Sequence, residues 1–219
     1  MRIGVISDVH ANLVALEAVL SDMPAVDELV CAGDVVGYNP WPAECVERVR
    51  EEAAACVMGN HDRKVALGEN YRANEMARAG IGLAQRALSA EQLEWLRALP
   101  EKTRAADGRV KIVHGHPADP DRYTYPELFG QDLLGDEDVL VMGHTHVQHH
   151  EVYDAGIALN PGSVGQPRDG DPRAAYAVVD LENMDVTEHR VDYDIDAVAD
   201  AVSDAGLPKD TGERLRQGK

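Results

Sequence analysis

Short apolar runs alternate with helix-like patterns along the chain, and most of these runs end in a polar loop. The first run, residues 3–7, reads IGVIS and has the β-branched composition of a buried strand. Asn12 follows as a candidate N-cap, and residues 13–20 place their apolar side chains at helical spacing. This order predicts an α/β fold, in which the loop after a strand is where ligands bind.

The rest of the chain continues this alternation and then turns mainly to strands. Strands are expected at 28–32, 55–58, 102–105, 110–113, 139–142, 148–153, 157–159, 174–179 and 186–191. Helices are expected at 42–54, 73–88, 91–99 and 195–202, and Ser89 with Gln92 forms a capping box for the third of these. Residues 118–138 are polar and irregular, and a polar tail begins at about residue 206. No linker or repeat divides the 219 residues, so we expect a single domain over 1–219.

Five of the expected strands end in side chains that can bind metal ions. They are Asp8 and His10, Asp34, Asn60 and His61, His114 and His116, and His144 and His146. Imidazole, carboxylate and amide groups without a thiolate exclude a structural zinc ribbon and favour a hydrolytic site for Mn, Fe, Zn or a similar ion. There are too many ligands for one ion, and two ions that share a carboxylate fit their number.

The chain is strongly acidic, with 39 Asp and Glu against 21 Lys and Arg and a formal charge of −18. Only five of the basic residues are lysines, a balance typical of proteins from a high-salt cytoplasm, although an ordinary acidic protein is the alternative. The charge argues against an extensive nucleic-acid surface, which needs clustered Lys and Arg. No apolar run approaches a membrane span, and the first strand begins without a signal-peptide pattern, so we expect a cytoplasmic protein.

The order of the strand-end motifs resembles that of the calcineurin-like metallophosphoesterase superfamily. The motifs are Asp-x-His, Gly-Asp, Gly-Asn-His-Asp, His-Gly-His and Gly-His-x-His, and the runs GDVVGYNPWP and NPGSVGQPRDGDPRAAYA are similar to its small, single-domain bacterial and archaeal phosphodiesterase branch. The resemblance covers about residues 1–195. It implies a four-layer αββα sandwich of two mixed β-sheets flanked by helices.

The same resemblance implies a role for each matching residue. The first ion would be held by Asp8, His10 and His146, the second by Asn60, His114 and His144, and both by the bridging Asp34. The cofactors would be two divalent ions, with Mn expected first and Fe, Zn, Ni or Co as alternatives. They would hold a bridging hydroxide that attacks a phosphodiester. His61 would be a catalytic residue that acts on the leaving group instead of binding metal.

Two further residues are candidates for substrate binding, each with an alternative. His116 would contact the substrate phosphate or donate a hydrogen bond to a metal ligand. Arg168 would hold an anionic phosphate through two hydrogen bonds, or form a salt bridge with Asp169 or Asp171.

The residues around these candidates also have two interpretations. Asp62 would orient His61 or cap the next helix. Tyr38 and Trp41 would form a wall of the substrate site or pack their own loop, and residues 160–163 would form a turn that supports the site.

The residues after Asp34 bear on the substrate. Protein phosphatases of the superfamily carry an arginine there, whereas this chain continues as Val-Val-Gly-Tyr. A site with fewer cations favours a phosphodiester monoanion over a phosphomonoester. We therefore expect a small phosphodiester as substrate and no membrane partner. The sequence leaves open whether the chain forms a homo-oligomer. The alternatives are a catalytically weak metal-binding scaffold, like the retromer subunit of this fold, and a phosphomonoesterase or nuclease of the superfamily.

Overall fold

Two mixed five-stranded sheets form the centre of the computed structural model, which describes residues 1–69 and 74–219. The first sheet has the order β10-β9-β1-β2-β3, with β1 (Arg2–Ile6), β2 (Glu28–Cys31), β3 (Ala55–Cys56), β9 (Ala174–Asp180) and β10 (Asp185–Val191). The second has the order β4-β5-β6-β8-β7, with β4 (Lys102–Ala105), β5 (Val110–Val113), β6 (Val139–Val141), β7 (His149–Tyr153) and β8 (Gly156–Asn160). The α/β class and the pair of mixed sheets expected from the sequence are confirmed.

Parallel strands at the centre of each sheet bring the candidate ligands together. Strands β1, β2 and β3 run parallel in the first sheet, and β5, β6 and β8 run parallel in the second. Parallel strands end at a common edge, and the loops beyond that edge are where open α/β sheets bind ligands. The loops after β1, β2, β5 and β6 carry Asp8, His10, Asp34, His114, His144 and His146, and Asn60 is the first residue of the helix that follows β3.

The two sheets pack face to face through alternating apolar side chains. In β1, Ile3 and Val5 point between the sheets, where they share a fully buried core with Ile112 and Val141 of the second sheet. Ile6 points the other way and packs against the helices. This period-two alternation is what a strand between two apolar layers requires.

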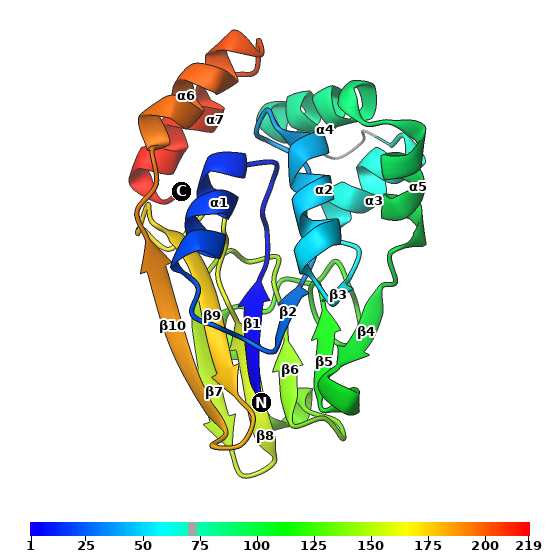
Figure 1. The fold of residues 1–219 in the computed structure, drawn as a ribbon, viewed down its shortest axis with the longest axis vertical. Coiled ribbons are helices and arrows are strands. Elements are labelled where there is room, and N and C mark those ends of the chain that lie inside the picture. Colours follow the sequence, from blue (N-terminus) through cyan, green and yellow to red (C-terminus); the bar gives the residue numbers. More distant parts are fainter. Residues whose placement is uncertain (70–73) are drawn as a thin grey trace.

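Helices cover the other face of the first sheet and gather in the upper half of Figure 1. They are α1 (Leu13–Asp22), α2 (Pro42–Glu52), α3 (Asn60–Leu67), α4 (Glu75–Ala87) and α5 (Ala90–Ala98). The expected caps are confirmed, because Asn12 accepts a hydrogen bond from Ala15 N and Ser89 exchanges hydrogen bonds with Gln92. The outer face of the second sheet packs instead, within the described residues, against a segment that contains two 3₁₀ turns, Pro126–Leu128 and Gln131–Leu133.

Helix α3 is an element that the apolar pattern did not predict. It begins directly after β3, and its polar first turn of Asn60, His61 and Asp62 hides the helical spacing of Val65 and Ala66. The expectation of a helix over 73–88 is met by α4, although residue 73 lies outside the described residues.

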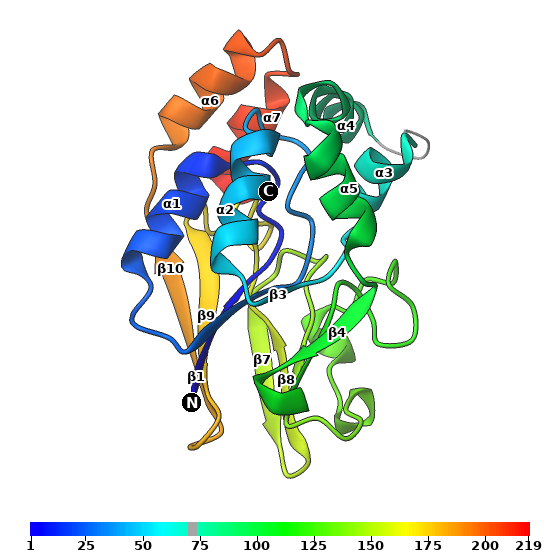
Figure 2. The same cartoon turned by 45° about the vertical axis from the view of Figure 1, so that its right-hand side comes forward.

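The segment after residue 206 is more than the polar tail that the sequence suggested. Helix α6 (Ile195–Asp204) is followed by α7 (Asp210–Glu213) and a 3₁₀ turn (Arg214–Gln217), and the C-terminus lies at the level of the helices, above the strands (Figure 2). Leu207 and Leu215 are buried against α6. Gly170 N donates to Gly218 O at 3.0 Å, so the last residues contact the loop that follows Arg168.

Within the described residues, no helix combines the length and the apolarity that crossing a bilayer demands.

The −18 charge leads to a prediction about salt. At molar ionic strength the Debye length is about 3 Å, so repulsion among the exposed carboxylates is screened. We expect the melting temperature to rise between low and molar KCl in thermal denaturation followed by circular dichroism. A flat or falling melting temperature would contradict adaptation of this acidic surface to high salt.

Candidate metal centre

The loops that carry the candidate ligands have an unusual backbone. Five of the expected ligands have left-handed φ angles between 49° and 68°, namely Asp8, His10, Asp34, His144 and His146. Non-glycine residues adopt this region at a cost of about 1–3 kcal/mol each, and such strain clusters at functional sites. Here the left-handed backbone occurs in the loops whose side chains converge on one site.

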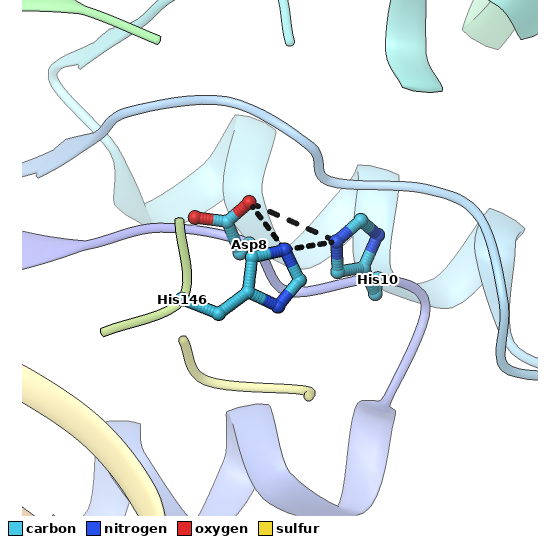
Figure 3. A group of neighbouring side chains, drawn as sticks. All are labelled: Asp8, His10 and His146. Atoms are coloured by element: carbon cyan, nitrogen blue, oxygen red, sulfur yellow. Dashed lines mark hydrogen bonds and ion pairs between the residues drawn. The ribbon is translucent and has the colours of Figure 1, made fainter. Parts of the chain in front are cut away.

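The first group consists of Asp8, His10 and His146, all buried (Figure 3). His146 Nε2 lies 3.1 Å from Asp8 Oδ1 and 3.1 Å from His10 Nε2, and His10 Nε2 lies 3.7 Å from Asp8 Oδ1. Asp8 Oδ2 accepts hydrogen bonds from Ser7 Oγ and His144 N, whereas the buried Oδ1 makes none within the described residues. A buried carboxylate oxygen that faces two imidazole nitrogens fits a divalent cation.

The second group consists of Asp34, His114 and His144, joined by Asn60. Asn60 Oδ1 lies 3.2 Å from His114 Nε2. Asp34 Oδ1 accepts from His61 N at 2.7 Å at the start of helix α3, which fixes the carboxylate. Asp34 Oδ2 lies 3.6 Å from His10 Nε2 and 3.5 Å from His114 Nε2. One oxygen thus faces an imidazole of each group, as a ligand shared by two ions would.

Hydrogen bonds to backbone carbonyls fix which nitrogen each imidazole presents. His10 Nδ1 lies 3.2 Å from Val36 O, His114 Nδ1 lies 2.7 Å from Ala32 O, and His146 Nδ1 lies 2.6 Å from Gln166 O. A carbonyl can only accept, so each Nδ1 carries a proton, and in the neutral ring Nε2 is the nitrogen that can bind a metal ion. His144 has the opposite arrangement, because its Nε2 lies 3.2 Å from Asp121 O and its Nδ1 is left for a metal ion.

Burial and the packed charges shift the pKa values of these groups. Burial lowers the pKa of His144 to about 4 and also lowers those of His10 and His146. Burial opposes ionisation of Asp34, but His114 and His61 hold the pKa of its carboxyl well below the usual value. Burial also opposes protonation of His114, yet Asp34 and Asp8 raise the pKa of its imidazole to about 10. At neutral pH the metal-free site therefore holds one proton that a metal ion must displace.

Metal binding should release that proton. Because the metal-free His114 has a pKa of about 10 and a ligating imidazole is neutral, binding at pH 7.5 should release at least about one proton per chain and should tighten as the pH rises. Titration calorimetry with Mn²⁺ in two buffers of different ionisation enthalpy measures this release. A release near zero would contradict a protonated His114.

His61 lies beside both groups. Its ring centroid is 4.8 Å from those of His10 and Tyr38, and with His10 and Asp34 it makes a third group of metal-binding geometry. Burial lowers its pKa to about 4, so its ring is neutral at pH 7 and can donate through one N–H. Gly37 has a φ of 103°, and a Cβ there would lie 2.5 Å from His61 Nδ1, so the ring needs this glycine.

Asp62 caps the backbone and does not orient His61. Its Oδ2 accepts from Gly59 N at 3.0 Å and its Oδ1 accepts from Val36 N at 3.1 Å. Of the two roles proposed from the sequence, the capping role is the one that the structure supports.

Arg168 reaches the site, and His116 lies apart from the groups described above. Arg168 Nη2 donates to Gln166 Oε1 at 2.7 Å and to Tyr38 Oη at 3.3 Å. The alternative salt bridges are wrong, because Asp169 pairs with Arg190 and Asp171 with Arg173. His116 sits in a tight turn, where its Nδ1 accepts from Ala118 N at 3.1 Å, and its substrate contact stays a prediction.

The turn at residues 160–163 supports the first group, as expected. Asn160 Nδ2 donates to Gly143 O and Thr145 Oγ1, which holds the loop between β6 and β7. Ser163 Oγ donates to Asp8 O at 2.7 Å. Trp41 packs against the apolar cores, which supports the packing role. Tyr38 contacts the His10 and His61 rings, and its role as a wall of the substrate site stays a prediction.

Two residues at the site were not singled out from the sequence. Tyr123 stacks on His144 with ring centroids 3.9 Å apart. Arg214, from the 3₁₀ turn near the C-terminus, lies close enough to Arg168 that burial and this second charge both lower the pKa of Arg214. Neither residue belongs to a motif, and Tyr123 falls in the irregular segment that carried no pattern.

Comparisons with known proteins agree with this geometry. The calcineurin-like phosphoesterase superfamily domain matches residues 1–184. A metallophosphoesterase structure from Sphaerobacter thermophilus is 39% identical and superposes with a TM-score of 0.87 over 100% of this chain and 99% of that one. The uncharacterised protein MJ0912 of Methanocaldococcus jannaschii is 34% identical and covers 99% of this chain and 98% of its own length.

A third relative carries a named activity. Phosphodiesterase YfcE of Escherichia coli K12 is 31% identical over 85% of this chain and 91% of its own length. The domain match, these relatives and the buried His and Asp groups agree with one another. The chain therefore belongs to the calcineurin-like phosphoesterase superfamily, in the small metallophosphoesterase branch that includes YfcE and MJ0912.

Proposed function

We propose that the protein hydrolyses phosphodiester bonds with two divalent metal ions. The observation that carries this proposal is the position of Asp34 Oδ2, 3.6 Å from His10 Nε2 and 3.5 Å from His114 Nε2. Asp34 would serve both ions from this position, and two such ions would supply the clamp used for in-line displacement at phosphorus. The phosphodiesterase activity in the name of YfcE supports the same reaction class.

The short contacts between the candidate ligands sort them into two sets, one for each ion. The first ion would be held by Asp8, His10 and His146, the second by Asn60, His114 and His144, and Asp34 would serve both. Bound ions, with Mn preferred, would supply Lewis-acid activation of the phosphoryl group and of the attacking water. The backbone carbonyls on the Nδ1 atoms keep three of the imidazoles in the ligating tautomer.

His61 serves the leaving group. Its neutral ring lies beside Asp34, which fixes the His61 backbone through a hydrogen bond of 2.7 Å. A neutral imidazole can donate a hydrogen bond to developing negative charge, as other enzymes show. His61 therefore stabilises the departing oxygen through its N–H, as a neutral ring at pH 7.

The loop after Asp34 favours a diester, because it brings no arginine to the site. Within the described residues Arg168 has no carboxylate partner, and it is held by Gln166 and Tyr38. Its charge faces the region of His61 and His146, where burial and the charge of Arg168 both lower the pKa values of the two imidazoles. The loop after Asp34 adds apolar Val35 and Val36 and no arginine. A monoanionic diester needs fewer cations than a dianionic monoester.

Matched chromogenic substrates test this function. Bis(p-nitrophenyl) phosphate and p-nitrophenyl phosphate share a leaving group, so their kcat/KM ratio reports the diester preference. We expect the Mn-loaded protein to prefer the diester, chelation to abolish turnover and Mn to restore it. A preference for the monoester would replace the diesterase proposal by a monoesterase. If the metal-loaded protein turned over neither substrate, the result would favour the binding scaffold.

A further inference from the structure

A groove opens beside the second metal group. It has a volume of about 240 Å³ and is lined by Asn60, Arg63, Lys64, Glu69, Asp121, Tyr123 and His144. Sites for drug-sized ligands span about 300–1,000 Å³, so this groove fits one arm of a substrate better than a whole one. Because Asn60 and His144 are expected metal ligands and also line the groove, a substrate whose phosphate is at the ions can extend one arm into it.

The charges in the groove balance. Arg63 pairs with Asp121 at 2.5 Å, and Lys64 and Glu69 add one charge of each sign. A second phosphate would need an excess of cations, and the lining residues that the structure describes carry no such excess. A neutral arm with hydroxyl or amino groups fits better, because the two carboxylates can accept its hydrogen bonds.

Tyr123 gives the groove a flat aromatic wall. Its ring stacks on His144 at 3.9 Å with 20° between the planes, and the side chain keeps 44% of its surface exposed. The nearly parallel Tyr125 ring is offset, with its centroid 5.9 Å away, and lies outside the groove lining. An exposed aromatic ring fixed beside a phosphate site is the surface on which nucleobases stack.

From these three features we infer that the groove holds a nucleoside arm of the substrate, with its base stacked on Tyr123 and its polar groups facing Asp121 and Glu69. The inference rests on the proposed function and narrows its substrate class to nucleoside phosphodiesters. Hydrolysis of the ester bond on the other arm adds water to phosphorus, releases that arm as an alcohol, and leaves a nucleoside monophosphate in the site.

The binding of that product can be measured without turnover. Isothermal titration calorimetry of the Mn-loaded protein would compare AMP with ribose 5-phosphate, which lacks the base. We expect AMP to bind about tenfold more tightly, in the range of the stacking of one base on an aromatic ring. Tyr123→Leu should remove this difference, Tyr123→Phe should keep it, and the control Tyr125→Leu should keep it as well.

Metal content and melting temperature are measured for each variant, because Tyr123 contacts a metal ligand. Equal binding of AMP and ribose 5-phosphate by the wild type would overturn the inference, and so would a preference that survives in a metal-loaded Tyr123→Leu. If Tyr123→Leu loses metal, two results still test the inference. They are the comparison of AMP with ribose 5-phosphate on the wild type, and the retention of the preference for AMP in Tyr123→Phe. A base preference in a protein that turns over no phosphodiester would support the groove and refute the proposed function, so the two failures are distinguishable.

Discussion

Asp34→Asn should reduce kcat/KM for an aryl phosphodiester by at least about 10²-fold, as removal of one preorganised electrostatic group does at other sites. Asparagine preserves the size of the side chain and an oxygen for the hydrogen bond from His61 N, but it removes the charge that faces His10 and His114. Both ions should bind more weakly, because both lose the shared carboxylate. Calorimetric metal titration and steady-state kinetics on the same preparation measure the two losses together.

Asp62→Asn is the matched control for this variant. Asp62 is as buried as Asp34 and accepts backbone hydrogen bonds, yet it faces Gly59 and Val36 instead of the imidazoles. We expect it to lower stability while metal stoichiometry is retained. Two tightly bound ions in Asp34→Asn would contradict the bridging role.

His61→Ala should leave metal content nearly unchanged and lower the rate by about 10²–10⁴ for a diester with a poor leaving group. A nitrophenolate leaves with little assistance, so the loss on the nitrophenyl ester should be smaller. Metal content should be retained because each metal group is complete without the His61 ring, although that ring adjoins both groups. Parallel kinetics on an alkyl and a nitrophenyl diester measure the difference.

His144→Ala provides the contrast. Its Nδ1 faces the second group, so this variant should lose metal and activity together for both substrates. Loss of metal from His61→Ala would make His61 a ligand of the third group formed with His10 and Asp34. Equal rate losses on good and poor leaving groups, with metals retained, would indicate that His61 acts on the phosphoryl group instead of the leaving oxygen.

The sequence indicated which side chains meet at the candidate metal centre, because these residues follow strands. Asp8, Asp34 and Asn60 each come after a strand of one parallel set, so the topology that the apolar pattern indicates also places them at one edge. Hydrogen bonding then selects the ligating nitrogen, which no pattern shows. The left-handed backbone of the ligand loops is equally invisible in the residue types, because Asp and His carry no signal comparable to glycine.

The surroundings of the centre depend on long-range packing and were predicted less well. Tyr123 reaches His144 from an irregular segment, and Arg214 reaches Arg168 because the C-terminal turn packs against the loop after it. Helix α3 was missed since its polar first turn serves the site instead of the core. His116 shares a motif with His114, but the tight turn after β5 places His116 apart from the two metal groups.

The most direct test of a binuclear centre is the number of ions bound by the wild-type chain. Metal-free protein would be loaded with excess Mn²⁺, freed of unbound metal, and measured by native mass spectrometry, with elemental analysis of the same sample as a check. The arrangement of Asp8, His10 and His146 on one side of Asp34, and of Asn60, His114 and His144 on the other, predicts two ions per chain. One ion per chain, or none, would contradict it.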